Sequence, residues 1–149
     1  MNRLRKNKRK GFTLVEIIVV LVIIAVLMAA LTPVMIGWIR EARDTAMLAN
    51  ARTGLTAAQS LVADNIGRGV TPLNADPTAM TTQTGTTFAN LTQGVPNAAT
   101  AFQFVTYDAG TGTITRLVYA PVAGGRCAEW TQVVGGVGAW AVLATPPLV

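Results

Sequence analysis

The spacing of hydrophobic positions changes twice along the chain. An apolar run without a charged residue extends from Ile17 to Ile39, slightly longer than the about 20 residues that a helix needs to cross a bilayer core. Beyond it, apolar residues recur at three- and four-residue steps, which predicts an amphipathic helix. This stripe consists of Leu48, Ala51, Leu55, Ala58, Val62 and Ile66. Together the patterns predict one long helix, with stop signals at Asn65 and Gly67.

The last third of the chain follows a different period. Apolar and polar residues alternate in short segments separated by glycine-rich turns, which predicts antiparallel strands. These segments are 102–107, 113–120, 128–134 and 139–144. A small sheet needs one covered face, and the amphipathic helix offers the large apolar surface for it. The expected fold class is therefore α+β, a long N-terminal helix packed against an antiparallel sheet of three or four strands, with Trp130 and Trp140 in the sheet core.

These patterns divide the chain into five segments. We expect a basic leader (1–11), a transmembrane helix (12–39), an amphipathic continuation (40–66), a loop rich in Thr, Gly and Asn (67–100) and the sheet (101–149). Pro33 and Gly37 interrupt the apolar run. Because a proline removes the hydrogen bond to the carbonyl four residues earlier, here that of Ala29, we expect a kink at this point. The hydroxyl of Thr32 is placed to satisfy the freed carbonyl.

Positive charge is concentrated at the N-terminus. The net charge is +5, but residues 1–10 hold six of the twelve Lys and Arg residues. Since the cluster 40–44 after the apolar run is balanced in charge, the positive-inside rule places the N-terminus in the cytoplasm and exports the rest. Without the first eleven residues the net charge is −1, so no direct nucleic-acid binding is expected.

The residue types exclude several kinds of chemistry. Histidine is absent and Cys127 is the single cysteine, so an intrachain disulfide, a Cys/His zinc site and a His-based triad are impossible. After Asp76 only Asp108 and Glu129 are acidic, too few for a calcium site. We expect no catalytic residue, no metal and no cofactor, and a buried Cys127. The tripeptide 90–92 matches the N-glycosylation sequon, a pattern that is frequent by chance.

Glu16 is the most informative residue. It is the only ionisable side chain between Gly11 and Ile39, and a charge deep in hydrocarbon costs roughly 2.5 to 3.5 kcal/mol. It closes the sequence Gly11-Phe12-Thr13-Leu14-Val15-Glu16, which follows the basic leader and precedes the apolar run. This arrangement resembles the N-terminal signature of type IV pilins and their pseudopilin relatives.

The resemblance implies how the chain is processed. A prepilin peptidase would cut after Gly11, and Phe12 would become the mature N-terminus and be N-methylated, which keeps the charge of its amine. This cation would pair with Glu16 of a neighbouring subunit, and a misplaced subunit would leave two unpaired charges in an apolar core. The resemblance implies that Thr13 takes part in assembly together with Phe12 and Glu16. Leu14 also matches the usual pattern, as does Pro33, which is similar to the helix-softening proline of the family.

The function that the resemblance implies is that of a non-enzymatic subunit polymerised into a type IV pilus or pilus-like filament. Its expected partners are a prepilin peptidase, copies of itself and other pilins, the inner or cytoplasmic membrane and a pilus assembly platform. Before assembly it would span the membrane once, with an extracytoplasmic C-terminal domain, and later lie in a cell-surface or periplasmic filament. The resemblance is close over residues 1–65. Beyond them it rests only on the expected architecture, a helix packed against an antiparallel sheet.

Three alternatives remain open at this point. The chain could be a pseudopilin of a type II secretion or competence system. It could be an uncut single-span membrane protein with an exported binding domain. A secreted protein with an ordinary signal peptide is the third, although the apolar run is too long for a typical signal and residues 28–30 form a poor cleavage site.

Overall fold

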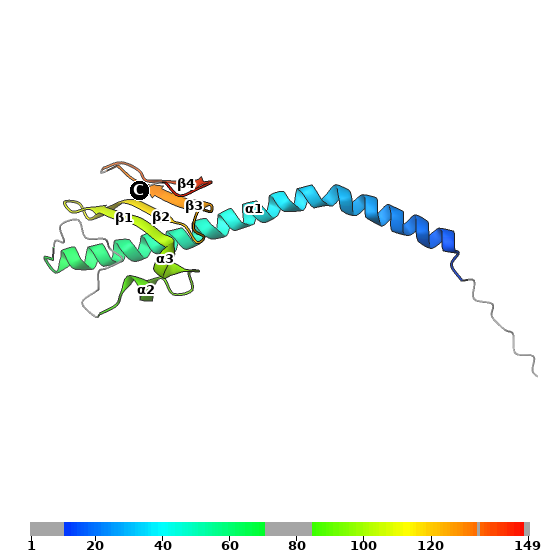
Figure 1. Cartoon of the computed structure of the whole chain (residues 1–149). Helices are drawn as coiled ribbons and strands as arrows, with labels where there is room; N and C mark the ends of the chain where they lie inside the picture. Colours follow the sequence, from blue (N-terminus) through cyan, green and yellow to red (C-terminus); the bar gives the residue numbers. More distant parts are fainter. Residues whose placement is uncertain (1–10, 71–84, 134, 148–149) are drawn as a thin grey trace, which may run out of the picture. The chain divides into compact units, whose positions relative to one another are not determined.

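The computed structural model of the protein (Figure 1) describes residues 11–70, 85–133 and 135–147. Residues 1–10 of the predicted leader and residues 71–84 of the predicted loop lie outside the described residues. The chain divides into two compact units, Met1–Glu41 and Ala42–Val149. A long N-terminal helix packs against a four-stranded antiparallel sheet, which confirms the predicted α+β class.

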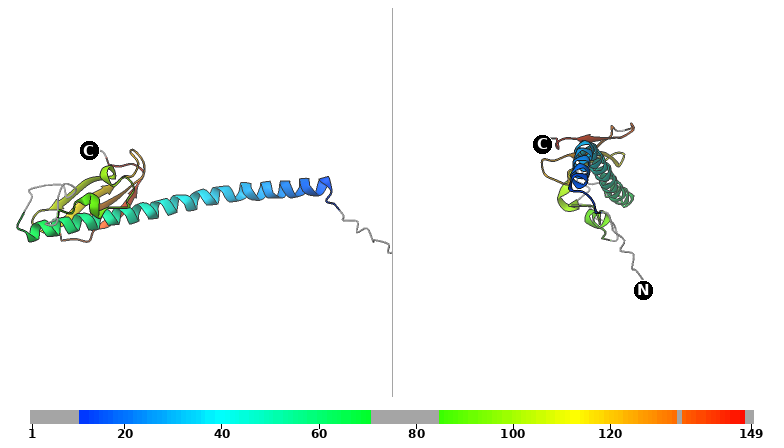
Figure 2. Two further views of the ribbon diagram at one scale, coloured as in Figure 1. Left: turned by 90° about the horizontal axis from the view of Figure 1, so that it is seen from below. Right: turned by 90° about the vertical axis from the view of Figure 1, so that its right-hand side faces the viewer.

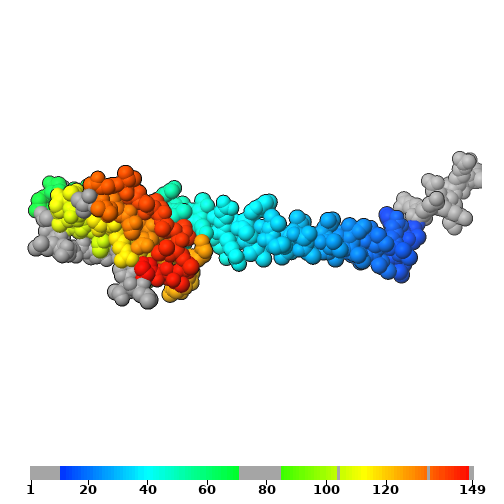
Figure 3. Space-filling model, turned by 90° about the horizontal axis from the view of Figure 1, so that it is seen from above, coloured from blue at the N-terminus to red at the C-terminus, as the bar shows by residue number. Residues whose placement is uncertain are grey.

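The first unit consists of the apolar half of helix α1 (Leu14–Gly67). Every described residue of this unit, from 11 to 41, is exposed, and Figure 3 shows the side chains uncovered along its length. An 18-residue window of the helix reaches a mean hydropathy of 3.2, and none of that window is buried. The segment is therefore long and apolar enough to cross a membrane. A helix that is apolar on all sides belongs in lipid or among other apolar helices.

α1 continues without interruption through Pro33 and Gly37. The hydroxyl of Thr32 donates to the carbonyl of Met28 at 2.8 Å. The carbonyl that Pro33 leaves without its usual donor is that of Ala29, so Thr32 bonds a different carbonyl from the one we predicted. A kink at Pro33 and Gly37 stays a prediction.

The far end of α1 is closed by a Schellman motif. Gly69 adopts φ +68°. Its N–H donates to the carbonyl of Ile66 at 2.9 Å, and the N–H of Val70 donates to that of Asn65 at 3.0 Å. Glycine suits this left-handed position because it has no Cβ. The residue that stops the helix is therefore Gly69, two positions after the predicted Gly67.

The sheet is an antiparallel meander in the order β1-β2-β3-β4. The strands are β1 (Phe102–Asp108), β2 (Thr113–Tyr119), β3 (Cys127–Thr131) and β4 (Ala139–Leu143). β3 is shorter than the predicted 128–134 because Gln132 leaves the regular ladder, with its N–H donating to the carbonyl of Thr115 at 2.9 Å. The other three strands occupy their predicted segments to within a residue.

One face of the sheet packs against the second half of α1 (Figure 2). The buried residues of the helix are Met47, Ala51, Gly54, Ala57, Ala58, Leu61, Val62 and Asn65. They meet Leu117, Tyr119 and Ala128 of the sheet, each 0% exposed. The buried stripe thus differs from the predicted one, in which Leu48 and Leu55 prove only half-buried, while Ile66 is 40% exposed.

At Gly54 the helix lies close against the ring of Phe102 from the sheet. A Cβ at this position would overlap the ring of Phe102. That ring is itself held by Phe88, with centroids 5.2 Å apart in an edge-on arrangement, and by Tyr119 at 4.8 Å. Since the ring has neighbours on both sides, the helix must be free of a side chain here.

The segment predicted as an irregular loop contains two single-turn helices, α2 (Phe88–Leu91) and α3 (Ala98–Ala101). Phe88 is 4% exposed and belongs to the main core. The hydroxyl of Tyr119 donates to the carbonyl of Pro96 at 3.0 Å. This part of the segment is therefore packed structure, and its description as a surface loop is wrong for these residues.

The sequon lies in α2 and the turn after it. Asn90 is exposed, but its side-chain oxygen accepts a hydrogen bond from the hydroxyl of Thr87 at 2.6 Å. The hydroxyl of Thr92 is buried and donates to the carbonyl of Phe88 at 2.9 Å. Both polar side chains of the sequon are already engaged, which disfavours glycosylation of the folded chain.

Candidate site at the helix N-terminus

The first turn of α1 contains a reciprocal pair of hydrogen bonds between Thr13 and Glu16. The N–H of Glu16 donates to the hydroxyl of Thr13 at 3.2 Å, and the N–H of Thr13 donates to Oε2 of Glu16 at 3.4 Å. This is a capping box, which satisfies two donors at a helix start where the first four N–H groups lack helical partners. The Thr-x-x-Glu spacing is a sequence signal for this motif, which the charge of Glu16 alone does not reveal.

The capping box turns the carboxylate of Glu16 toward the start of its helix. There the helix dipole is positive and favours an anion. A carboxylate has about four lone-pair positions, and the box occupies one of them with a single N–H. The group therefore keeps accepting capacity for a further donor at the helix N-terminus.

Phe12 and Gly11 lie directly beside this carboxylate. Together with Thr13 and Glu16 they line a shallow hollow of about 350 Å³. Phe12 is 81% exposed. In the uncut chain its nitrogen is an uncharged amide; a cut after Gly11 would convert it into a cation adjacent to the N–H that Glu16 binds. Pro33 lies elsewhere, about 25 Å further along the helix at 1.5 Å per residue.

Nothing in the fold requires glycine at position 11. A Cβ added to Gly11 would meet no atom within 4 Å, and the same holds for Gly37. A requirement for glycine at position 11 would therefore come from a partner that approaches the backbone, and not from packing within the chain.

Comparison with known families adds one finding. The family described as the prokaryotic N-terminal methylation motif matches residues 6–32. The chain carries the type IV pilin signature. The matched stretch includes the hollow formed by Gly11, Phe12, Thr13 and Glu16. With the apolar half of α1, the pilin signature fits a subunit that is anchored in a membrane before assembly. Neither the curated proteins nor the solved structures include a match to the chain.

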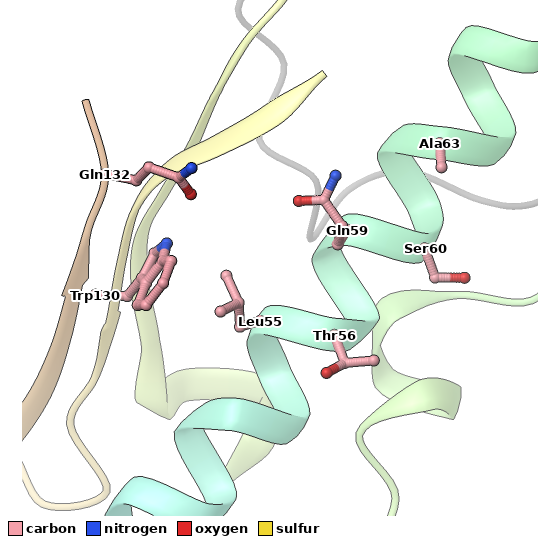
Figure 4. A pocket seen from close by; sticks show the side chains of 7 residues that line it. All are labelled: Leu55, Thr56, Gln59, Ser60, Ala63, Trp130 and Gln132. Atoms are coloured by element: carbon pink, nitrogen blue, oxygen red, sulfur yellow. The ribbon is translucent and has the colours of Figure 1, made fainter. Parts of the chain in front are cut away.

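A second concave region lies between α1 and β3, and sequence reasoning missed it (Figure 4). The groove measures about 440 Å³. Its lining residues are Leu55, Thr56, Gln59, Ser60, Ala63, Trp130 and Gln132. Trp130 is half-buried, donates its indole N–H to the carbonyl of Ile114 at 3.4 Å, and contacts the ring of Trp140 at 5.3 Å. Gly138 packs under the same indole, where a Cβ would overlap it.

The polar side chains of this groove serve the fold. The amide of Gln59 donates to the carbonyl of Gly112 at 2.9 Å and accepts from the N–H of Ile114 at 3.4 Å. The amide of Gln132 donates to the carbonyl of Gly136 at 3.0 Å. In the described ranges, no group of three or more His, Cys, Asp or Glu comes together. The groove therefore offers apolar surface and no evident chemistry.

Cys127 is a structural residue. With Val118 and Ala120 it forms a second small buried cluster beside Leu143, and it is 0% exposed. This confirms the expected burial. Burial raises the pKa of its thiol, and the negative charge of Glu129 raises it further. Because the thiolate is the reactive form, both the burial and the raised pKa disfavour reaction of this thiol.

Proposed function

We propose that the chain is a prepilin-type subunit that is cut after Gly11, N-methylated on Phe12 and polymerised into a type IV pilus or pilus-like filament. The observation that carries the proposal is Glu16, a single carboxylate at the head of an uncovered apolar helix, within the pilin signature. The proposed partners are a prepilin peptidase, an assembly platform, copies of this chain and other pilins.

Before assembly, the apolar half of α1 lies in the membrane with its N-terminus in the cytoplasm. The basic residues at 1–10 favour this topology by the positive-inside rule. Glu16 then lies near the cytoplasmic edge of the span, where a charge can reach the headgroups at modest cost. The capping box further reduces that cost because the carboxylate and the N–H of Thr13 satisfy each other.

Cleavage changes the charge balance of this site. The new amine of Phe12 is a cation, and the carboxylate of Glu16 has accepting capacity beyond its capping bond. An amine from a neighbouring subunit then completes the pair inside the filament. A shift of one subunit along the filament would leave both charges unpaired in an apolar core, so the pair sets the register as well as the attraction.

The capping role and the pairing role of Glu16 can be separated by two substitutions. Glu16→Val removes both, whereas Glu16→Gln keeps an oxygen that accepts from Thr13, as capping boxes allow. Removing one partner of a buried ion pair costs about 3–5 kcal/mol, so both variants should reduce the yield of sheared filaments by more than about 100-fold. Electron microscopy and immunoblotting of sheared fractions measure this yield.

Two controls accompany this experiment. Both variants should remain membrane-inserted, and N-terminal sequencing with mass measurement should show Phe12 as a methylated first residue. Normal filaments from Glu16→Gln would contradict the ion pair between subunits. Glu16 would then have only its capping role in the first turn of the helix. An intact leader on the unchanged chain would instead support the uncut single-span alternative. Immunogold labelling of filaments outside the cell or in the periplasm separates the pilus from the pseudopilin alternative.

A further inference from the structure

We propose that the loop between β2 and β3 rests on the exported face of the membrane before assembly and inserts Val122 into the interfacial region of the lipid. The inference rests on the proposed function in one respect, that the apolar half of α1 lies in a membrane. It adds a second lipid contact, made by the sheet-bearing unit.

A bidentate ion pair ties this loop to the helix. Nε of Arg126 lies 2.9 Å from Oδ1 of Asp44, and Nη2 lies 2.6 Å from Oδ2. Two parallel bonds between a guanidinium and a carboxylate fix orientation as well as distance. Both residues belong to the second unit, so the loop is held at the first helical turns of that unit.

Chain connectivity keeps this point close to the membrane. Ile39 is the last residue of the apolar run, and Asp44 follows five positions later. In helical form this separation is about 7.5 Å, and even a fully extended chain would span no more than about 18 Å. Each interfacial layer of a bilayer is roughly 5–7 Å thick. The residue that anchors the loop therefore lies no more than about 18 Å from the end of the apolar run.

The loop has the composition and shape that a lipid interface accepts. Val122 is 66% exposed, and no charged residue separates it from Arg126. The N–H of Gly125 donates to the carbonyl of Val122 at 3.0 Å, and Gly124 adopts φ +69°, so the turn is preformed. An apolar tip with an arginine at its base matches the boundary between acyl chains and phosphates.

The loop between β3 and β4 provides a matched control on the same sheet. It carries Val137, which is 97% exposed and lies beside a glycine pair, as Val122 lies close to Gly124 and Gly125. The start of this loop lies opposite helix residues 55–63. That stretch begins about 16 Å and ends about 28 Å beyond Asp44 along the helix axis. A valine here is equally apolar and more exposed, but it has no tie to the membrane-proximal turn.

The test uses the full chain in liposomes of neutral and anionic phospholipid that contain acyl chains spin-labelled near the headgroup. Val122→Cys and Val137→Cys are each labelled with an environment-sensitive fluorophore. Cys127 is 0% exposed and should not react, which the unchanged chain checks. We expect at least twofold quenching and a blue-shifted emission at position 122, and neither at position 137.

The outcomes distinguish the two proposals. A chain that resists alkaline carbonate extraction but shows no quenching at position 122 overturns the loop contact alone. If alkaline carbonate extracts the chain from the liposomes, both the membrane stage of the proposed function and the loop contact are overturned. Equal quenching at positions 122 and 137 also overturns the inference, because it would indicate non-specific adsorption of the sheet.

The ion pair has its own test in the labelled Val122→Cys chain. Asp44→Ala should reduce quenching at position 122 by at least half, while resistance to carbonate stays unchanged. Exchange of the two charges, with Asp44→Arg and Arg126→Asp together, should restore most of the quenching. Unchanged quenching in Asp44→Ala would show that the ion pair does not position the loop.

Discussion

The carboxylate of Glu16 is held by the first turn of its own helix and is not left free. In the proposed assembly, an incoming amine would meet a carboxylate that Thr13 already orients. The side chain has lost part of its rotational freedom before pairing, so less entropy remains to be lost on contact. Charge pattern alone identified Glu16, whereas the orienting role of Thr13 follows from the unpaired N–H groups of a helix start.

A side chain at position 54 should destabilise the fold. Gly54→Val would force the ring of Phe102 away from Phe88 and Tyr119, and overpacking of a core typically costs about 1–3 kcal/mol. Gly54→Ala should cost less, because alanine regains up to about 1 kcal/mol of helix propensity. Urea unfolding followed by circular dichroism measures both differences in the free energy of unfolding.

Gly67 is the matched control for this substitution. It lies in the same helix, and a Cβ there would meet no atom within 4 Å. Gly67→Ala should therefore leave the free energy of unfolding unchanged or slightly raised. Equal destabilisation by alanine at positions 54 and 67 would indicate a backbone effect and contradict the packing argument.

The sequence identified Ala51, Ala58 and Val62 as core residues but could not identify Gly54. Periodicity reports hydrophobic side chains, and glycine has none. The need for glycine arises from Phe102, which is distant in sequence and reaches the helix only after the sheet has formed. The need for a small residue at a helix–sheet contact is therefore recognised in the folded chain and not from the sequence pattern.

At the scale of elements, Gln59 joins the helix to the start of β2. Its side-chain amide pairs with the carbonyl of Gly112 and the N–H of Ile114, as a neighbouring strand would. Gln59→Leu leaves both backbone groups without a partner, at an expected cost of about 1–3 kcal/mol. Hydrogen exchange at the amide of Ile114 should accelerate together with the loss of stability.

Gln103→Leu serves as a control for this prediction. Gln103 is exposed on β1, an edge strand, so its replacement should change stability by no more than about 0.5 kcal/mol. Gln59→Leu with unchanged exchange at Ile114 would show that the amide does not hold the strand.

The long elements could be predicted because hydrophobic residues recur along them at a clear helical or strand period. α1 and all four strands were expected, whereas the single-turn helices α2 and α3 are too short to display a helical period. The choice of Gly69 to close α1 also depends on geometry: Gly67 and Gly69 lie two positions apart, and only backbone hydrogen bonding identifies Gly69 as the one in the left-handed conformation.

At the scale of the whole molecule, the buried core and the apolar half of α1 (the stem, residues 11–41) belong to different units. The described buried residues all belong to the unit that begins at Ala42, and none lies between 11 and 41. A chain that begins at Ala42 should therefore fold in aqueous buffer without detergent. Its urea unfolding should be one cooperative transition, with coincident midpoints from tryptophan fluorescence and circular dichroism.

Two outcomes would contradict this expectation. Separate midpoints for the two signals, or loss of near-ultraviolet dichroism with retained helix, would show that the stem is needed for specific packing. The Gly54→Val substitution in the same shortened chain should lower the midpoint, which ties the transition to the contact between helix and sheet.

The buried thiol of Cys127 has a consequence for the life of the subunit. Because the thiol is buried in its cluster, oxidants and neighbouring chains have no access to it in the folded chain. The fold thus needs neither an oxidising compartment nor an oxidoreductase, and it forms no covalent crosslinks between protomers. In the proposed filament, a subunit built this way would leave a dismantled fibre with its thiol unchanged and could be used again.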